Sequence, residues 1–546
     1  MIKQLFSSLV ILFTFNTVTA QTPCPDFEWA MNVDTLVDAI ASDGIGNSYV
    51  TGTFYGTVTF GNTTLTSSGD ERDIYIAKLD TLGNYVWAKK VGIEALSNGH
   101  NYGNSGGITV DSVGNVYVTG TFRGRATFGS TVLTSPLLQA PIFIAKLNAS
   151  GNFVWARKIQ GQNTQNGSDM YARGISVDAS GHIYVTGGST NRLVFGTIQG
   201  PTVGVFVTKL DDMGNFLWVK GSEYDQPYSS RGLDIAVDTL GNNYITGSFQ
   251  GTLVLGNITL ISNGENDIFI AKLDTNGNFI WAKQAGGASN YADLGNGIII
   301  DAAGNSYITG SFNDTAVFGN TTLTTENSDI FVAKLDVSGN FIWAKQFGVT
   351  GSGAGNDIVV DAWGNTYITG TYQGSVTLGN TTLTAWDIQS DVFITKLDAS
   401  GNNFLWAAQG SSEPGASGWG AGIAMDSSGN NYVAGVLGGD AVFGDYILNY
   451  GGFITKLNAC SELGFNALDS SNISIYPNPS KVSFTVSGTP IGATLFITDI
   501  AGKVVYNKQT FSEQIVIETT PFTNGVYFVN IEHNGNRIVE KLIIKK

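Results

Sequence analysis

Short aliphatic and aromatic runs alternate with Gly-Asn turns along most of the chain. One unit, residues 296–346, has such runs at 296–301, 306–312, 329–336 and 341–346. Aromatic and β-branched runs bounded by turn residues are typical of β-strands, and no segment with a helical period of useful length competes. The pattern predicts four strands per unit, with a small excursion at residues 317–320 between the second and third strands.

This unit recurs seven times. A tryptophan in the last run returns every 58 to 68 residues, and a Tyr-x-Thr/Ala-Gly phrase and a Lys-Leu phrase each occur seven times. The tryptophans are Trp29, Trp87, Trp155, Trp218, Trp281, Trp343 and Trp406. Seven four-stranded units predict an all-β fold, a seven-bladed β-propeller. A right-handed β-helix is the structural alternative, but it requires shorter rungs and no tight hairpins.

The order of the phrases predicts how such a ring would close. The last unit loses its tryptophan strand after Lys456, and the missing strand stands near the start of the chain at residues 27–30. We therefore expect the N-terminal strand to complete the seventh blade, which leaves no open sheet edge. Cys24 and Cys460, the two cysteines, map to the same turn position from opposite ends of the ring. In an exported protein this predicts a disulfide.

Two phrases carry a family resemblance. Residues 304–310 (GNSYITG) and 331–336 (FVAKLD) resemble the bacterial β-propeller repeat called SBBP. The resemblance covers about residues 24–465 and implies a fold more than an activity.

The C-terminal segment has a different pattern. Residues 473–479 (ISIYPNP), 499–505 (DIAGKVV), 525–529 (GVYFV) and 541–546 (KLIIKK) alternate strands with glycine turns, which predicts a small β-sandwich. These phrases resemble the type A sorting domain of type IX secretion substrates. That resemblance implies export across the outer membrane of a Bacteroidetes-type bacterium, handling by the type IX secretion machinery and removal of the domain at the surface.

The N-terminus reads as an export signal. Lys3 precedes an apolar run at residues 5–15, and small residues follow at 18–20. The expected organisation is a signal peptide at 1–20, the propeller at 21–465, a linker at 466–472 and the sorting domain at 473–546. No later segment is long and apolar enough for a transmembrane helix. The sequence thus predicts a secreted or cell-surface protein.

Charge narrows the range of partners. The chain has 28 Lys and Arg against 44 Asp and Glu, a net charge of −16, and only 13% of its residues are charged. This balance disfavours nucleic acid as a partner. Residues 473–546 carry a net charge of +2 and residues 21–472 a net charge of −19, in keeping with two regions of different character.

Recognisable catalytic or metal-binding motifs are scarce. The three histidines are His100, His182 and His533, and no H-E-x-x-H, C-x-x-C, G-x-S-x-G or phosphate-loop phrase occurs. We expect no cofactor and no metal site. An aspartate precedes the first turn of each unit, and we expect its side chain to cap that turn rather than bind calcium. The seven lysines of the Lys-Leu phrase are expected to lay apolar stems between blades and keep their charges at the rim.

Function is expected where the units differ. The links from each tryptophan strand to the next unit vary, and they carry aromatic residues among Asn, Ser and Gly. The candidate ligand-binding residues are Tyr102, Tyr171, Tyr228, Tyr291 and Trp419. Aromatic rings among neutral polar groups favour a protein or glycan ligand held mainly by stacking and apolar burial. Alternatively, each ring packs over the blade below it.

The leading hypothesis is a secreted propeller that binds a protein or glycan without catalysis. The alternative is a secreted hydrolase or lyase that uses acids of the same loops. Those acids are Glu94, Asp169, Glu223, Asp225, Asp293 and Glu413. A pair of convergent carboxylates would favour the enzyme.

Overall fold

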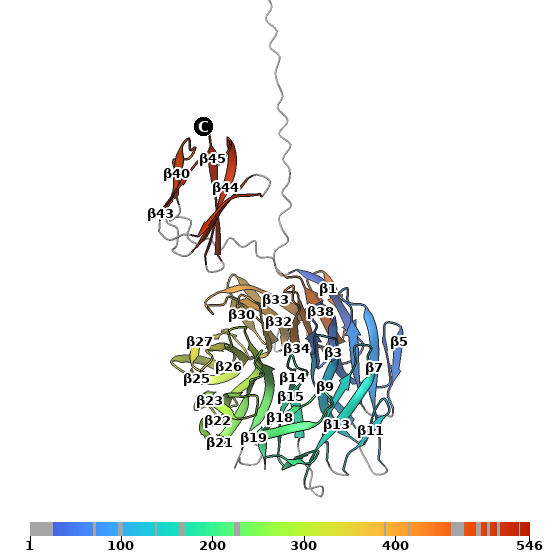
Figure 1. Cartoon of the computed structure of the whole chain (residues 1–546). Helices are drawn as coiled ribbons and strands as arrows, with labels where there is room; N and C mark the ends of the chain where they lie inside the picture. Colours follow the sequence, from blue (N-terminus) through green and yellow to red (C-terminus); the bar gives the residue numbers. More distant parts are fainter. Residues whose placement is uncertain are drawn as a thin grey trace, which may run out of the picture. The chain divides into compact units, whose positions relative to one another are not determined.

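A computed structural model describes residues 26–459 and 474–546. Short stretches within these ranges are outside the description: 69–71, 97–101, 137–138, 163–169, 202, 223–229, 387–388, 413–414, 488–492, 500–502, 510–513 and 534–535. The chain forms two compact units, one up to Ala459 and one from Cys460. Every regular element in the described residues is a β-strand (Figure 1), which confirms the predicted all-β class.

The first unit contains seven four-stranded antiparallel arrays, which we number sheets 1 to 7 in the order of their first strands. Sheet 1 has β2 (Ala39–Ser42), β3 (Ser48–Phe54), β6 (Asp73–Leu79) and β7 (Tyr85–Glu94). Sheet 2 has β8 (Tyr102–Val110), β9 (Val116–Arg123), β12 (Ile142–Leu147) and β13 (Phe153–Gly161). Sheet 3 has β14 (Met170–Val177), β15 (Ile183–Ser189), β18 (Gly204–Leu210) and β19 (Phe216–Gly221). Sheet 4 has β20 (Arg231–Val237), β21 (Asn243–Leu255), β22 (Ile258–Leu273) and β23 (Phe279–Ala285).

The remaining sheets follow the same plan. Sheet 5 has β24 (Leu294–Ile300), β25 (Ser306–Phe318), β26 (Thr321–Leu335) and β27 (Phe341–Gln346). Sheet 6 has β28 (Gly353–Val360), β29 (Thr366–Tyr372), β32 (Asp391–Leu397) and β33 (Phe404–Ser412). Sheet 7 has β34 (Gly418–Met425), β35 (Asn431–Leu437), β38 (Gly451–Leu457) and, from the start of the chain, β1 (Phe27–Val33).

The predicted excursion is a hairpin. In sheets 4 and 5 the second and third strands run on into this hairpin, so in sheet 5 both are longer than the sequence predicts. A register shift, between Gln250 and Thr252 in sheet 4 and between Asn313 and Thr315 in sheet 5, marks where the hairpin begins. Elsewhere the hairpin strands are separate elements: β4 (Thr57–Phe60), β5 (Thr63–Thr66), β10 (Arg125–Phe128), β11 (Thr131–Thr134), β16 (Leu193–Phe195), β17 (Ile198–Gln199), β30 (Ser375–Leu378), β31 (Thr381–Thr384), β36 (Ala441–Phe443) and β37 (Tyr446–Leu448). Strands β10, β16 and β36 pair with the last strand of the preceding sheet.

The repeated Tyr-x-Thr/Ala-Gly phrase has a packing cause. A Cβ atom at Gly310 would lie 1.8 Å from the Leu294 carbonyl oxygen and 2.9 Å from the Phe331 ring. A Cβ atom at each equivalent glycine would likewise meet a backbone carbonyl oxygen within 2.2 Å; the oxygen belongs to the first strand, except at Gly52, where it is that of Leu36 just before β2. These glycines are Gly52, Gly120, Gly187, Gly247, Gly370 and Gly435. No side chain fits there, so each second strand approaches the first closely only because the residue is glycine.

Neighbouring sheets are joined by a contact that repeats along the chain. The Trp281 indole packs on Gly339 in a turn of the next sheet, and its Nε1 donates a hydrogen bond to Val337 O at 3.1 Å. Trp29 in sheet 7 packs in the same way on Gly83 of sheet 1 and donates to Thr81 O at 3.3 Å. The first sheet therefore receives from the N-terminal strand the contact that later sheets receive from their predecessors.

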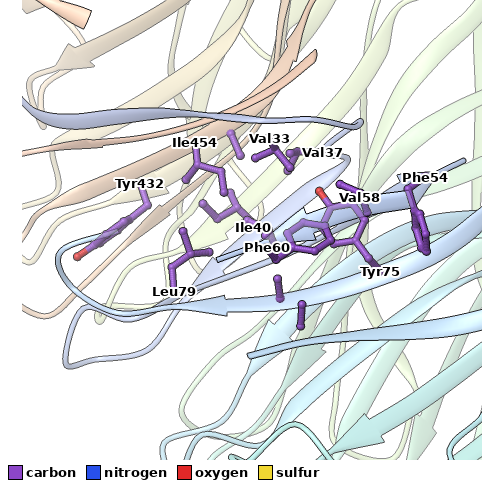
Figure 2. Close-up of a cluster of buried hydrophobic side chains, with 14 of the residues drawn as sticks. Val33, Val37, Ile40, Phe54, Val58, Phe60, Tyr75, Leu79, Tyr432 and Ile454 are labelled. Carbon is purple, nitrogen blue, oxygen red and sulfur yellow. The ribbon is translucent and has the colours of Figure 1, made fainter. Parts of the chain in front are cut away.

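Sheets 1 and 7 also share a core. Strand β1 pairs with β38 and places Trp29 opposite Lys456. A buried cluster joins Phe54, Tyr75 and Leu79 of sheet 1 to Tyr432 and Ile454 of sheet 7, as Figure 2 shows. The first strands of successive sheets contact one another, and β34 of the last sheet contacts β2 of the first.

The second unit is a pair of small sheets. One is β39 (Ser474–Tyr476), β40 (Ser483–Ser487) and β43 (Gln514–Glu518); the other is β42 (Val504–Gln509), β41 (Thr494–Asp499), β44 (Gly525–His533) and β45 (Asn536–Ile544). Phe484 and Ile517 of the first pack in one buried cluster with Leu495, Val529 and Leu542 of the second. Alternate residues of these strands thus form a single apolar core.

Candidate functional site

The turns at one end of the sheets are built alike. The Asp301 Oδ1 atom accepts hydrogen bonds from the backbone N–H groups of Ala303 and Asn305, at 3.0 and 2.9 Å. Its Oδ2 atom accepts from Asn305 Nδ2 at 2.8 Å and from the Tyr307 hydroxyl at 3.1 Å. The same turn bonding recurs at Asp43, Asp111, Asp178, Asp238, Asp361 and Asp426. The predicted capping role is confirmed, and these carboxylates are occupied by their own turns.

The repeated lysines lie over the rings of the tyrosines in these turns. The Lys334 Nζ atom lies 4.7 Å from the centroid of the Tyr307 ring, and the equivalent pair occurs in all seven sheets. The expectation that these lysines keep their charges at the rim is wrong for Lys146, Lys209, Lys396 and Lys456, which are buried. A cation over a tyrosine face retains favourable electrostatics away from water, so the ammonium group folds inward. This turn end, with its Asp, Tyr and Lys residues, is called the repeated face below.

A cavity of about 440 Å³ lies among the variable ends of sheets 7, 1, 2 and 3. Its walls include Tyr102, Asn104 and Ser105 of β8, Tyr171 and Arg173 of β14, and Trp419 of β34; the link before β2 adds Asp38, and Arg72 precedes β6. We call it the variable-face cavity. Sheets 4 to 6 do not have this combination of side chains at the equivalent positions.

A narrower cavity of about 100 Å³ continues from it. Residues of the first strands of all seven sheets line this space, which we call the channel. Asp38, Gly106, Arg173 and Ala421 line both cavities, so the variable-face cavity opens into the channel at these residues. Register shifts in the first strands, such as those between Ala172 and Gly174 and between Gly232 and Asp234, mark the bulges that turn side chains inward.

The channel holds three carboxyl groups near one arginine. Burial raises the pKa of Asp234 to about 7, Asp357 adds to that rise, and burial raises the pKa of Asp357 to about 6. Burial likewise raises the pKa of Asp38. The Ser105 hydroxyl donates a hydrogen bond to this carboxyl, which opposes the rise. The positive charge of Arg173 opposes all three rises.

Three arginine side chains at or behind the variable-face cavity have no acceptor among the described residues. Within the described part of the chain, the guanidinium groups of Arg72, Arg173 and Arg231 form neither a hydrogen bond nor an ion pair. Arg231 lies over the Tyr171 ring at 5.9 Å, and Arg72 over the Tyr55 ring at 5.6 Å. The sequence analysis did not identify these arginines. One signal in the sequence could have revealed them: each is a basic residue near a bulge or strand end, at a position where the other units have no basic residue.

The predicted ligand-binding residues divide into three groups. Tyr102, Tyr171 and Trp419 line the variable-face cavity, and Trp419 is 51% exposed. The Tyr171 hydroxyl is buried without a hydrogen-bond partner, so this residue presents its ring rather than its oxygen. Tyr291 is 70% exposed but lies outside the cavity walls, and Tyr228 lies outside the described residues.

The acids of the enzyme alternative do not converge among the described residues. Glu94 pairs with Arg125 at 3.9 Å. Asp293 is 1% exposed and faces Asp267 across Gly286, where a Cβ atom would lie 3.0 Å from Asp293 Oδ2 and 2.7 Å from Asp267 Oδ1. Burial raises the pKa of Asp293 to about 7 and that of Asp267 to about 6. Asp169, Glu223, Asp225 and Glu413 lie outside the described residues, as do His100 and both cysteines of the predicted disulfide, Cys24 and Cys460.

Two kinds of feature are absent from the described residues: a metal-binding cluster and a membrane-spanning helix. No group of three or more His, Cys, Asp or Glu side chains there is arranged to hold a metal ion. No helix there has the length and apolar character that a membrane crossing requires.

Comparison with family models identifies both parts of the chain. The β-propeller repeat SBBP matches residues 86–121 and 280–313, and the secretion system C-terminal sorting domain matches residues 474–545. These matches confirm the resemblances found in the sequence.

Similar curated proteins cover parts of the chain. A WD repeat-containing protein of Acanthamoeba polyphaga mimivirus is 24% identical over 373 residues, 55% of this chain and 26% of its own length. An endo-acting ulvan lyase of Formosa agariphila is 32% identical over 83 residues, 15% of this chain and 16% of its own length. The chain thus spans about a quarter or less of the length of the curated relatives it matches.

Solved structures match the chain at low identity and low TM-score. PorZ, a surface component of the type IX secretion system of Porphyromonas gingivalis, covers 92% of this chain and is itself covered to 73%, at 14% identity and a TM-score of 0.25. An ulvan lyase covers 74% of this chain and is covered to 93%, at 12% identity and a TM-score of 0.42. Scores this low assign no activity. The repeats and the C-terminal domain together show that the chain is a β-propeller repeat protein exported by type IX secretion to the cell surface or beyond.

Proposed function

We propose that this protein is a secreted seven-bladed propeller that binds a glycan or protein ligand in the variable-face cavity without catalysis. The carrying observation is that the cavity brings together side chains, such as Tyr102, Arg173 and Trp419, that do not recur as a set in sheets 4 to 6. A cavity with a few convergent polar groups among aromatic rings is the usual form of a ligand site.

Ring closure is the first part of the proposal. Each of sheets 1 to 7 would be one blade, with β1 as the outer strand of the seventh. Support comes from the pairing of β1 with β38, from the Trp29 contact on sheet 1 and from the channel lined by all seven first strands. Closure would bring β34 beside β2 and so create the cavity between blades 7, 1, 2 and 3.

Binding rather than catalysis is supported by the acids near the cavity. Asp38 is the one carboxyl in its described walls, and glycoside hydrolysis normally uses two. The one described close pair of variable-face acids, Asp267 and Asp293, is buried away from the cavity walls. The predicted domain limits, with the sorting domain at 473–546 as an address, belong to the same proposal.

Paired tryptophan variants of the full chain test the binding site. Trp419 borders the variable-face cavity at 51% exposure, whereas Trp363, 76% exposed, lies in a turn of the repeated face. Ligands would first be selected with a glycan array and a surface-protein pull-down. Trp419→Ala should then weaken binding by about 1–3 kcal/mol, as for a central aromatic anchor, with little change in the thermal midpoint.

Trp363→Ala is the matched control and should bind as wild type does. If both variants bind as wild type does while Trp419→Ala unfolds more easily, the ring is a lid over its blade and the cavity is not the site. Turnover of a selected glycan that Asp38→Asn abolishes would establish the hydrolase or lyase instead.

A further inference from the structure

We propose that the variable-face cavity recognises an acidic saccharide, one whose sugar rings carry carboxylate or sulfate groups. This inference deepens the proposed function and rests on it. Its structural basis is the unpaired guanidinium groups of Arg72 and Arg173 in the described cavity walls, near the exposed Trp419 ring, with Arg231 over the Tyr171 ring behind them.

Other arginines show how this chain satisfies a guanidinium group when its role is structural. Arg157 donates to the carbonyl oxygens of Gly214, Ala156 and Met213 at 2.9 to 3.2 Å, and thereby ties sheet 2 to a turn of sheet 3. Arg125 pairs with Glu94. Arg72, Arg173 and Arg231 make no such bond in the described structure, so their planar donor forks remain available to a ligand.

Arg173 occupies the position that a buried anionic group would reach. It lines both the variable-face cavity and the channel, and its side chain is exposed to that space. Asp38, Asp234 and Asp357 lie near enough to feel its charge, but none is within ion-pair distance of it in the described structure. A carboxylate or sulfate in the variable-face cavity would lie among the guanidinium groups of Arg72 and Arg173 and the one carboxyl of the described walls, Asp38.

The positive groups contrast with the charge of the whole unit. The described cavity walls hold Arg72 and Arg173 against Asp38, with Arg231 stacked behind Tyr171. Residues 21–472 as a whole carry a net charge of −19. An excess of arginine at one cavity of an acidic unit indicates recognition of negative charge by bidentate hydrogen bonds.

The remaining walls favour a saccharide over an acidic peptide. Trp419 and Tyr102 offer flat faces against which a sugar ring can stack, and Asn104, Ser105 and Thr121 offer polar groups for hydroxyls. The first strands at this cavity are the end strands of their sheets, and a bound peptide commonly adds to such an edge. The experiment below therefore includes an acidic peptide as a probe.

Titration of the full chain with four probes tests the proposal. The probes are an oligomer of galacturonic acid, the same oligomer as its methyl ester, a sulfated galactan oligomer of equal length and an oligo-aspartate peptide. We expect the first or third to bind and the ester and peptide to bind at least tenfold more weakly. Comparison of the first and third identifies the anionic group.

Arginine variants assign the effect to the cavity. Arg173→Ala should weaken binding of the acidic oligomer at least tenfold and leave the thermal midpoint within a degree or two. Arg192→Ala is the matched control, because Arg192 is exposed in the link between β15 and β16 and lies outside the cavity walls. It should have no effect.

Four results would overturn the proposal: equal binding of acid and ester, preference for the aspartate peptide, no effect of Arg173→Ala, or no binding of either acidic oligomer at millimolar concentration. If ester and acid bind equally and Trp419→Ala weakens both, the anionic specificity fails while the proposed binding function stands.

Discussion

The repeated face and the variable-face cavity place similar residue types in opposite situations. On the repeated face, the Tyr307 hydroxyl donates to Asp301 and the Lys334 ammonium lies over the Tyr307 ring, so these groups serve one another. At the variable-face cavity, Asp38, Tyr171 and Arg173 line the same walls, yet in the part of the chain that the structure describes the Arg173 guanidinium has no acceptor and the Tyr171 hydroxyl no partner. The difference teaches that repetition marks groups that hold the fold. Departure from repetition marks groups available to a ligand.

The largest expected effect concerns the join between the two ends of the first unit. Phe27 pairs with Leu457, and in the sequence Cys24 stands three residues before Phe27 and Cys460 three residues after Leu457, both outside the described residues. We predict a disulfide there. Mutating both cysteines to serine should lower the free energy of unfolding by about 4–5 kcal/mol on the chain-entropy model, measured by denaturant titration of the exported protein. Two free thiols in the native protein by mass spectrometry would refute the pairing.

The next effect tests the close strand approach behind every unit. Gly310→Ala would place a Cβ atom 1.8 Å from the Leu294 carbonyl oxygen, and relief of that clash requires the first strand of sheet 5 to move. We expect a loss of about 3 kcal/mol, at the upper end of overpacking costs. Gly44→Ala, with no atom within 4 Å of the new Cβ, is the control and should change little. Equal unfolding midpoints for the two variants would contradict this account.

A smaller effect is expected at Asp267 and Asp293, where removing a charge should raise the free energy of unfolding rather than lower it. Their pKa values, raised by burial to about 6 and about 7, mean that the folded protein holds these protons more tightly than the unfolded chain. Stability should therefore fall as pH rises from about 4 through 7. Asp293→Asn removes one charge but keeps only one of the two oxygens that accept the Gly287 and Asn313 backbone N–H groups, so the lost hydrogen bond offsets part of the gain.

This variant should gain about 1–2 kcal/mol at pH 8, since one pKa unit corresponds to about 1.4 kcal/mol, and little at pH 4. Unfolding titrations at both pH values measure the difference. A destabilised variant at pH 8 would show that these carboxyls are ionised and stabilised by an interaction we have not identified.

The smallest stability effect tests one bond of the repeated face. Tyr307→Phe removes the hydroxyl that donates to Asp301 Oδ2, while Asn305 Nδ2 still donates to that oxygen. The expected loss is about 1 kcal/mol, the net contribution of one hydrogen bond. The six other sheets retain the equivalent bond, so the first unit should keep its structure. Ligand affinity should therefore be unchanged. An altered affinity would connect the two ends of the unit and weaken the distinction drawn between them.

Much of this architecture can be predicted from the sequence because its determinants are local and repeated. Gly-Asn turns, the Trp phrase and the Lys-Leu phrase predict four strands per unit, and the position of Trp29 predicts its partner strand. The hairpin at residues 317–320 was predicted only as an excursion, because its pairing depends on a register shift between Asn313 and Thr315. The inward position of the lysines depends on a tyrosine from a neighbouring strand, which spacing alone does not reveal.

The site was less predictable for a physical reason. Tyr102, Tyr171 and Trp419 were found as aromatic residues in variable links, but Arg72 and Arg173 come from different sheets and meet only through tertiary packing. The expectation of neutral stacking consequently left out the charged part of the cavity. Tyr291 shares the composition of the other candidates yet lies outside the cavity walls, so composition alone does not separate a cavity residue from an exposed one.

Amide hydrogen exchange of the full chain, with and without saturating acidic oligosaccharide, tests the central claim most directly. The account predicts slower exchange in the variable-face parts of β8, β14 and β34, and unchanged exchange in the repeated-face turns such as residues 301–305. Protection confined to the repeated face, or to sheets 4 to 6, would contradict the claim that ligand recognition resides where the repeat is broken.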